Sequence, residues 1–271
     1  MKRRTLQSAY MNWAKTRSGA TYNLAASDLS YLPISELPVT WEKLELATST
    51  GYGYPPLLDS IGRHEGVDPK CVVSTIGTSM ANYVAMASLI QPGDEVVIEH
   101  PTYELLVSTA EFLGADVKRF HRRFEDDFLI EPGGVRKAVT PNTRLIVITN
   151  LHNPSNAFTD EGTLNEIAAI ARGVGARVLV DEVYLDAAFS RAPRSAFHLG
   201  PEFVTTDSLT KVYGISGLRC GWILAEPDVA QQMRRLVDLH YSTHVTIAEQ
   251  LSVIAFAHLG KIAQRDRKSV V

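Results

Sequence analysis

One lysine stands out for its sequence context rather than for its charge. Lys211 lies in Thr206-Asp-Ser-Leu-Thr-Lys-Val-Tyr-Gly214, among hydroxyl side chains, and it precedes Gly214, Gly217 and Arg219. Most lysines are surface charges, so the residue type alone predicts nothing more. A lysine amine forms a Schiff base with an aldehyde when partial burial beside a bound cofactor holds the amine uncharged. The context therefore indicates a nucleophilic amine at Lys211.

An acidic residue ends a second apolar run. Asp181 closes Arg177-Val-Leu-Val-Asp181, so a carboxylate stands where a hydrophobic strand leaves the core. A helix cap or a solvated loop acid is the ordinary interpretation. The functional interpretation is a buried carboxylate that holds a proton on a pyridine nitrogen, because a protonated ring accepts the electrons of a carbanion. Tyr184, which follows in the same segment, would present its hydroxyl to a phenolic oxygen of that ring.

The segment Gly77-Thr-Ser79 precedes a predicted helix. Its simplest interpretation is a helix start capped by Thr78 or Ser79. The start of a helix also offers unpaired backbone N–H groups and the positive end of the helix dipole to a phosphate. Ser208 and Arg219 would complete a phosphate site, with the guanidinium supplying the full positive charge.

Two further residues fit a flat, phosphorylated aromatic ligand. Tyr103, in Pro101-Thr-Tyr103, is either a packing aromatic or a plate on which a ring stacks. Asn153, in His152-Asn-Pro154, is otherwise a routine turn residue. An amine, a buried acid, a phosphate site and a stacking tyrosine are the groups that pyridoxal 5′-phosphate (PLP) requires.

These residues follow short apolar runs that predict strands. The seven candidates are Cys71–Ile76, Glu95–Glu99, Asp116–Phe120, Arg144–Thr149, Arg177–Val180, Phe203–Thr206 and Leu218–Leu224. Most successive pairs are separated by helical patterns, at Ser79–Ile90, Leu105–Leu113 and Thr163–Arg172, the last with Thr163 as N-cap and Glu166 completing a capping box. This alternation predicts an α/β fold with a mostly parallel seven-stranded sheet flanked by helices. Ligands of such sheets bind beyond the carboxyl ends of the strands, where the residues singled out above fall.

Composition excludes several classes of protein. The 271 residues are 45% hydrophobic and 21% charged, with a net charge of −3, which argues against nucleic acid or an anionic membrane surface as the main partner. No run approaches the roughly 20 apolar residues of a membrane span, and the basic start lacks the apolar run of a secretory signal. Cys71 and Cys220 are too few for a disulfide framework. His240 and His244 have helical spacing but no evident third ligand, so we predict no metal site. We expect a cytoplasmic protein.

The segments that carry this chemistry resemble one family. The sequence is similar to the class I/II aminotransferases, which are fold-type-I PLP-dependent enzymes, over roughly Gly51 to Leu239. The matching segments are Thr75-Ile-Gly-Thr-Ser-Met-Ala-Asn82, Pro92-Gly-Asp-Glu-Val96 with Pro101-Thr-Tyr103, Asn150-Leu-His-Asn-Pro154, Asp181-Glu-Val-Tyr184 and Ser208-Leu-Thr-Lys-Val-Tyr-Gly-Ile-Ser-Gly-Leu-Arg219.

The resemblance implies a role for each candidate residue. Lys211 would hold PLP as a Schiff base and later shuttle the α-proton of the substrate, while Asp181 would pair with the pyridine nitrogen. The other implied contacts are Asn153 and Tyr184 to the phenolic oxygen, Tyr103 on the ring face, and Gly77, Thr78, Ser79, Ser208 and Arg219 to the phosphate. Tyr52 or Tyr54 would reach the phosphate of a neighbouring subunit, which implies a homodimer. The implied substrates are an amino acid and a 2-oxo acid.

Three positions depart from the family pattern. Asn156 stands where the motif usually has glycine; if the position needs positive φ, asparagine is the least costly replacement. Asp28 stands where relatives commonly carry glycine, and its charge would repel a substrate carboxylate. The chain stops at Val271, whereas relatives continue for a small domain on the order of 100 residues that supplies a carboxylate-binding arginine.

These departures shape the expected domain organisation and activity. We expect an N-terminal arm with part of a small domain in residues 1–50, a PLP-binding large domain in 51–240, and the start of a truncated C-terminal small domain in 241–271. Such a chain would bind PLP but transaminate poorly or not at all.

The same residues allow other activities. A carbon–sulfur lyase or an amino-acid decarboxylase would use the same Lys211 and Asp181, and a catalytically impaired remnant would still bind PLP. Neither a glycine-rich nucleotide-binding loop nor a G-x-S-x-G nucleophile elbow occurs in the sequence. The motifs do not identify the amino-acid substrate.

Overall fold

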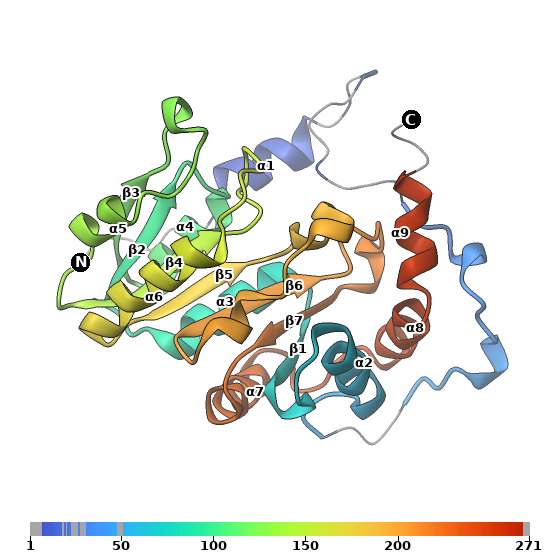
Figure 1. The fold of residues 1–271 in the computed structure, drawn as a ribbon. Coiled ribbons are helices and arrows are strands. Elements are labelled where there is room, and N and C mark those ends of the chain that lie inside the picture. Colours follow the sequence, from blue (N-terminus) through green and yellow to red (C-terminus); the bar gives the residue numbers. More distant parts are fainter. Residues whose placement is uncertain are drawn as a thin grey trace. The chain divides into compact units, whose positions relative to one another are not determined.

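A computed structural model describes residues 7–17, 19, 21–22, 27, 31–47 and 51–267 (Figure 1). The chain forms two compact units. The first unit comprises Met1–Ser27, Ala85–Glu182 and Ala196–Val204. The second unit comprises Asp28–Val84, Val183–Ser195 and Thr205–Val271.

The predicted seven-stranded α/β architecture is confirmed. The strands are β1 (Val72–Ile76), β2 (Glu95–His100), β3 (Asp116–His121), β4 (Thr143–Thr149), β5 (Arg177–Asp181), β6 (Phe203–Ser208) and β7 (Cys220–Leu224), in the order β1-β7-β6-β5-β4-β2-β3. β2 pairs in parallel with β3 and β4, and β4 pairs in parallel with β5. β7 is antiparallel to β1 and β6, so the sheet is mixed. Residues 209–219 contain no α-helix, and a parallel neighbour normally needs a helical crossover.

Helices occupy most of the connections between strands. The described helices are α1 (Ala9–Thr16), α2 (Pro55–Glu65), α3 (Thr78–Leu89), α4 (Glu104–Phe112), α5 (Pro132–Ala138), α6 (Glu161–Val174), α7 (Pro227–Tyr241), α8 (Thr246–Phe256) and α9 (Leu259–Arg267), of which α3 to α6 connect successive strands. Within the described part of the chain, none of them has both the length and the apolar character needed to cross a bilayer.

Two element boundaries predicted from the sequence are wrong. The N-cap of α6 is Asp160, not Thr163, because the Asp160 carboxylate accepts a hydrogen bond of 2.8 Å from the Thr163 backbone N–H. Leu218 belongs to a 3₁₀ turn rather than to the last strand. Arg219 has φ +51°, a left-handed conformation that a strand does not accommodate, so β7 begins at Cys220.

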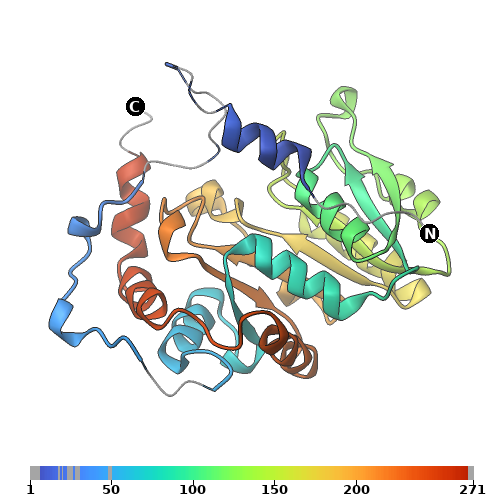
Figure 2. The ribbon, with the colours of Figure 1, turned by 180° about the vertical axis from the view of Figure 1, so that it is seen from behind.

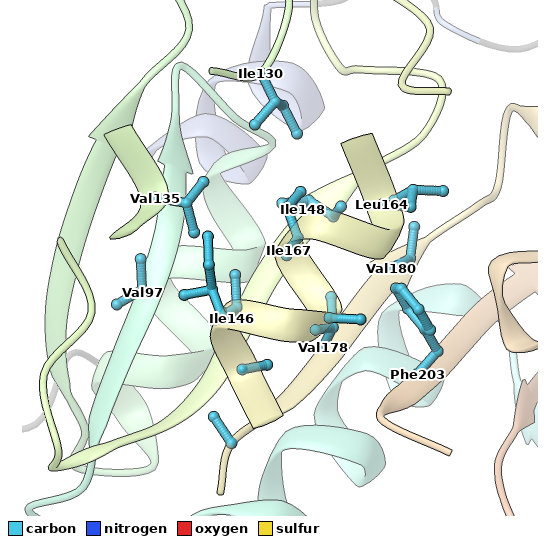
Figure 3. Packing of buried hydrophobic residues seen from close by; sticks show 14 of the residues in the cluster. Val97, Ile130, Val135, Ile146, Ile148, Leu164, Ile167, Val178, Val180 and Phe203 are labelled. Atoms are coloured by element: carbon cyan, nitrogen blue, oxygen red, sulfur yellow. The ribbon is translucent and has the colours of Figure 1, made fainter. Parts of the chain in front are cut away.

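The first unit is built on a buried apolar layer between the sheet and two helices. α5 and α6 cover one face of β2, β4 and β5, and α4 lies on the opposite face (Figures 1 and 2). Side chains of Val97, Ile146, Ile148, Val178 and Val180 point from the strands into this layer (Figure 3). Each fully buried aliphatic side chain contributes about 1.5–3 kcal/mol. The layer fixes the strands whose carboxyl ends carry Asn150–Asn153 and Asp181.

The second unit packs three helices on β1 and β7. α2 and α7 contact β1, and α8 contacts both β7 and α2. Trp222 of β7 is 1% exposed, and its indole N–H donates a hydrogen bond of 2.8 Å to the Glu65 carboxylate at the end of α2. This packing holds the turn between β1 and α3 and the loop between β6 and β7, which carry most of the predicted phosphate and lysine residues.

Candidate cofactor site

The turn between β1 and α3 forms a cradle lined by two glycines. Gly77 has φ +82°, and a Cβ on it would lie 2.3 Å from a terminal guanidinium nitrogen of Arg219. A Cβ on Gly221 of β7 would lie 2.5 Å from the carbonyl carbon of Gly77. The contact at Gly221 is with backbone atoms and requires glycine, whereas Gly77 favours glycine because of its positive φ, since the end of the Arg219 side chain is able to move. The two glycines let Arg219 and β7 approach the start of α3 closely. We call this turn, with Thr78, Ser208 and Arg219, the anion cradle.

The polar groups of the anion cradle are joined to one another. The Thr78 hydroxyl donates a hydrogen bond of 2.8 Å to the Ser208 hydroxyl, which also accepts from the Thr210 N–H at 3.2 Å. The exposed guanidinium of Arg219 donates to the Ile76 carbonyl at 3.4 Å and to the Ser216 carbonyl at 3.3 Å. Ser79 is exposed in the first turn of α3. A cationic guanidinium, hydroxyl groups and a helix N-terminus are the donors that a phosphate monoester needs.

Lys211 lies in the closed loop between β6 and β7. The Leu209 N–H donates to the Cys220 carbonyl at 3.0 Å, and the Ile215 N–H donates to the Leu209 carbonyl at 3.2 Å. Val212 is buried beside the half-buried Lys211. The loop therefore holds Lys211 on a fixed backbone directly after the strand that ends in Ser208.

Two predicted residues lie at the carboxyl ends of parallel strands in the first unit. Asp181 is the last residue of β5 and is 4% exposed, and its carbonyl accepts a hydrogen bond of 2.9 Å from the Asn150 N–H. Asn153 follows β4, and its backbone N–H donates to the Thr149 hydroxyl at 2.9 Å. A carboxylate this deeply buried requires a charged or hydrogen-bonding partner.

Tyr103 stands at the N-cap of α4, after β2. Its hydroxyl lies 3.8 Å from the sulfur of Met11, and its ring meets Tyr10 edge to face, with centroids 5.9 Å apart. Ser8, which caps α1, is hydrogen-bonded to Glu104 in the first turn of α4. Helix α1 therefore packs beside the predicted stacking tyrosine.

The Asn150–Asn156 loop tests the departure from the family motif at Asn156. Asn156 has φ +60°, so the prediction of a position that favours glycine and tolerates asparagine is confirmed. The Asn156 N–H donates to the His152 carbonyl at 2.7 Å, which closes the turn. Asp28, the other departure, lies outside the described residues.

The remaining predicted residues belong to the second unit. Tyr184 is half-buried in the segment that follows β5. Tyr52 is 51% exposed and lines a small pocket together with Ser74 and His244. Tyr54 is the residue before α2. The His244 ring lies 3.3 Å from the Ser74 hydroxyl, and among the described residues no cluster of three His, Cys, Asp or Glu side chains is placed to bind a metal.

The sequence interpretation missed a buried charge pair beneath Asn153. Arg122 and Glu99 are joined at 2.8 Å, and both side chains are 0% exposed. Glu99 also accepts from the Thr149 N–H at 2.7 Å and from the Thr149 hydroxyl at 2.6 Å. Since Thr149 in turn accepts from the Asn153 N–H, the pair fixes the loop that carries Asn153. The only sequence signal was a glutamate at the end of an apolar strand.

His152 joins the same loop to the segment before Tyr103. Burial lowers the pKa of His152 to about 4, so the imidazole is neutral at pH 7. Its Nε2 lies 3.0 Å from the Pro101 carbonyl, which only accepts, so Nε2 carries the proton. Its Nδ1 then accepts from the Ser155 hydroxyl at 2.6 Å. The Asn153 loop and the Tyr103 segment are thereby held together within the first unit.

One protein family matches most of this chain. The aminotransferase class I and II family matches residues 47–269. An aspartate aminotransferase of Pyrococcus horikoshii is 30% identical over 63% of this chain and 44% of its own length. Capreomycidine synthase of Streptomyces vinaceus is 30% identical over 69% of this chain and 48% of its own length. The chain thus spans about half the length of the curated relatives it matches.

Solved structures show the same fold. A PLP-dependent aminotransferase from Streptococcus suis is 29% identical, with a TM-score of 0.87 over 95% of this chain and 72% of that chain. An aspartate aminotransferase of Thermus thermophilus, solved with maleate, is 22% identical with a TM-score of 0.76 and supports the fold alone. Members of the matched family use PLP. From the match over residues 47–269 and the shared fold, this chain belongs to the class I and II aminotransferase family.

Proposed function

We propose that this chain binds PLP through Lys211 and that the protein transfers an amino group from an amino acid to a 2-oxo acid. The observation that carries the proposal is the anion cradle. Gly77 and Gly221 are both spaced so that a Cβ would collide with Arg219 or with the backbone. The Arg219 guanidinium and the start of α3 therefore form a phosphate site, and Lys211 follows Ser208 of that site in the same loop.

In this proposal each remaining residue contacts one part of the cofactor. Asp181 keeps a proton on the pyridine nitrogen, and its burial favours such a charged hydrogen bond. Tyr103 stacks on the ring, and Asn153 and Tyr184 bind the phenolic oxygen. When bound, PLP supplies an electron sink for a carbanion at the substrate α-carbon. Lys211 Nζ would hold the cofactor through its aldehyde carbon, and once the substrate amine has taken that place the free Lys211 amine would take up and return the substrate α-proton.

We also infer a cytoplasmic homodimer in which residues 51–240 form the cofactor-binding domain. Tyr52 or Tyr54 of one subunit would reach the phosphate at the neighbouring site. The half-exposed ring of Tyr52 beside Gly51 and Gly53 is consistent with such a contact. Cys71 and Cys220 are free and buried, as in a reducing compartment.

The reaction type is tested by product analysis. The purified full chain is loaded with PLP and incubated with a panel of amino acids, each with and without a 2-oxo acid acceptor. We expect pyridoxamine phosphate and a new 2-oxo acid, and such turnover would overturn the expectation from the sequence that this chain transaminates poorly or not at all. Release of ammonia would identify a lyase, and release of carbon dioxide a decarboxylase. A chain that binds PLP but exchanges its amino group with no member of the panel would overturn the transferase proposal in favour of an impaired remnant.

Gly77→Ala tests the anion cradle. The new Cβ would displace the Arg219 guanidinium, which removes a charge-assisted contact worth about 1.5–3 kcal/mol. We expect PLP to bind roughly tenfold to a hundredfold more weakly in an equilibrium titration. Gly134→Ala is the matched control, since a Cβ at Gly134 meets nothing within 4 Å. Equal PLP affinity in Gly77→Ala and Gly134→Ala would contradict the assignment of the cradle.

A further inference from the structure

Three segments of the second unit meet at one carboxylate. Asp186 lies in the 3₁₀ turn Leu185–Arg191, directly after Tyr184. Its Oδ2 accepts a hydrogen bond of 2.5 Å from the Tyr213 hydroxyl and lies 3.3 Å from Nε2 of His64. Tyr213 belongs to the loop between β6 and β7, and His64 to the last turn of α2.

Tyr213 joins this carboxylate to the loop that carries Lys211. It lies two positions after Lys211 in the sequence, and it is 7% exposed. The Leu209–Cys220 and Leu209–Ile215 backbone hydrogen bonds close the base of the loop. The hydrogen bond from the Tyr213 hydroxyl to Asp186 attaches the middle of the same loop. The Lys211 loop and the turn that follows Tyr184 are thereby linked through a single side chain.

His64 holds the carboxylate from the other side. Its ring packs against Phe256, Trp222 and Tyr213, with centroid distances of 5.7, 6.2 and 6.5 Å. Burial alone would raise the pKa of Asp186, but the hydrogen bonds from His64 and Tyr213 outweigh it and lower that pKa. Burial alone would lower the pKa of His64, but the bond to Asp186 and the charges of Glu65 and Asp186 raise it. Asp186 is therefore an anion at neutral pH, and its charge favours protonation of His64.

We propose that Asp186 is a positioning residue for Lys211: through Tyr213 it fixes the Lys211 loop against the turn that carries Tyr184. The proposal rests on the proposed role of Lys211 in binding PLP. A preorganised amine reacts faster than one whose loop must first be ordered, because the ordering entropy has already been lost. The Asp186 side chain is 29% exposed, so it contributes little to the apolar core. Its loss should affect the Lys211 loop more than the stability of the unit.

The test compares Asp186→Asn, Tyr213→Phe and the double variant with wild type. The rate at which the visible absorbance of the Lys211–cofactor linkage grows after addition of PLP is measured by stopped flow. We expect each single variant to be about tenfold to a hundredfold slower. The double variant should be no slower than the slower single variant, because both changes break the same bond. Asp59→Asn, an exposed acid on α2, is the control and should match wild type.

A second measurement does not depend on PLP. In an NMR titration of the chain without added cofactor, the pKa of His64 should fall in Asp186→Asn and stay raised in Asp59→Asn. Attachment rates equal to wild type in Asp186→Asn and Tyr213→Phe would overturn the positioning role. If wild type itself attaches no PLP at Lys211, the proposed function fails instead, and the His64 titration still reports whether Asp186 organises this cluster. Circular dichroism on each variant establishes that it is folded.

Discussion

Replacing Lys211 with alanine should abolish the covalent attachment of PLP. Wild-type protein mixed with PLP should develop a visible absorbance band, and borohydride should then fix the cofactor's mass on the peptide that contains Lys211. The Lys211→Ala chain should show neither signal, because the amine that condenses with the aldehyde is gone. The expected loss is complete rather than graded. Lys137→Ala, which removes an exposed lysine from the last turn of α5, should behave as wild type.

Two further variants separate the chemistry of Lys211 from its charge. Lys211→Arg keeps a long nitrogen-bearing side chain in the half-buried loop but lacks a primary amine, so it should also fail to attach PLP. A small primary amine added to Lys211→Ala should restore part of the visible absorbance if the anion cradle is intact. A borohydride-stable cofactor on another lysine of the Lys211→Ala chain would show that this assignment of the Schiff base is wrong.

The sequence predicted the parts of the fold that local patterns encode. The apolar run at β4 and the helical periodicity of α6 both supply side chains to the buried layer of the first unit. Both elements were located from the sequence to within a few residues. The strained position of Asn156 was also predictable, because a motif that normally has glycine implies positive φ. The ends of the apolar runs therefore predicted where β4 and β5 end at the edge of the sheet.

Features that depend on distant residues were not predictable in the same way. The antiparallel pairing of β7 depends on how residues 209–219 reverse the chain, and no local periodicity records that. Arg122 pairs with Glu99 across two strands, 23 positions apart in sequence. Asp186 meets Tyr213 from a different segment, and its neighbours along the chain give no hint of that contact. Such pairs arise from tertiary structure alone.

Glu99→Gln should produce the largest loss of stability among the variants considered. The substitution keeps the shape of the side chain but removes its charge, which leaves the Arg122 guanidinium buried without a counter-ion. Whichever way the amide turns, its N–H₂ would also face a donor, either Arg122 or the Thr149 N–H and hydroxyl, which now donate to Glu99. Removing one partner of a buried ion pair typically costs about 3–5 kcal/mol. Urea unfolding of the variant should show a loss of that size.

A double variant distinguishes pairing from packing. Glu99→Gln combined with Arg122→Met removes both charges, so part of the lost stability should return. Asp116→Asn, which breaks the exposed ion pair with Lys118 within β3, should cost far less, because solvent screens that pair. A Glu99→Gln chain as stable as Asp116→Asn would show that the buried charge is dispensable.

The same variant should also weaken the cofactor site. Thr149 connects Glu99 to the Asn153 N–H, so a loosened Thr149 frees the loop that carries Asn153. We therefore expect weaker PLP binding in Glu99→Gln even at temperatures where the chain remains folded. The double variant should regain affinity together with stability, because with Arg122→Met the amide oxygen at position 99 can again accept from the Thr149 N–H and hydroxyl. Stability and cofactor affinity would then depend on the same buried network.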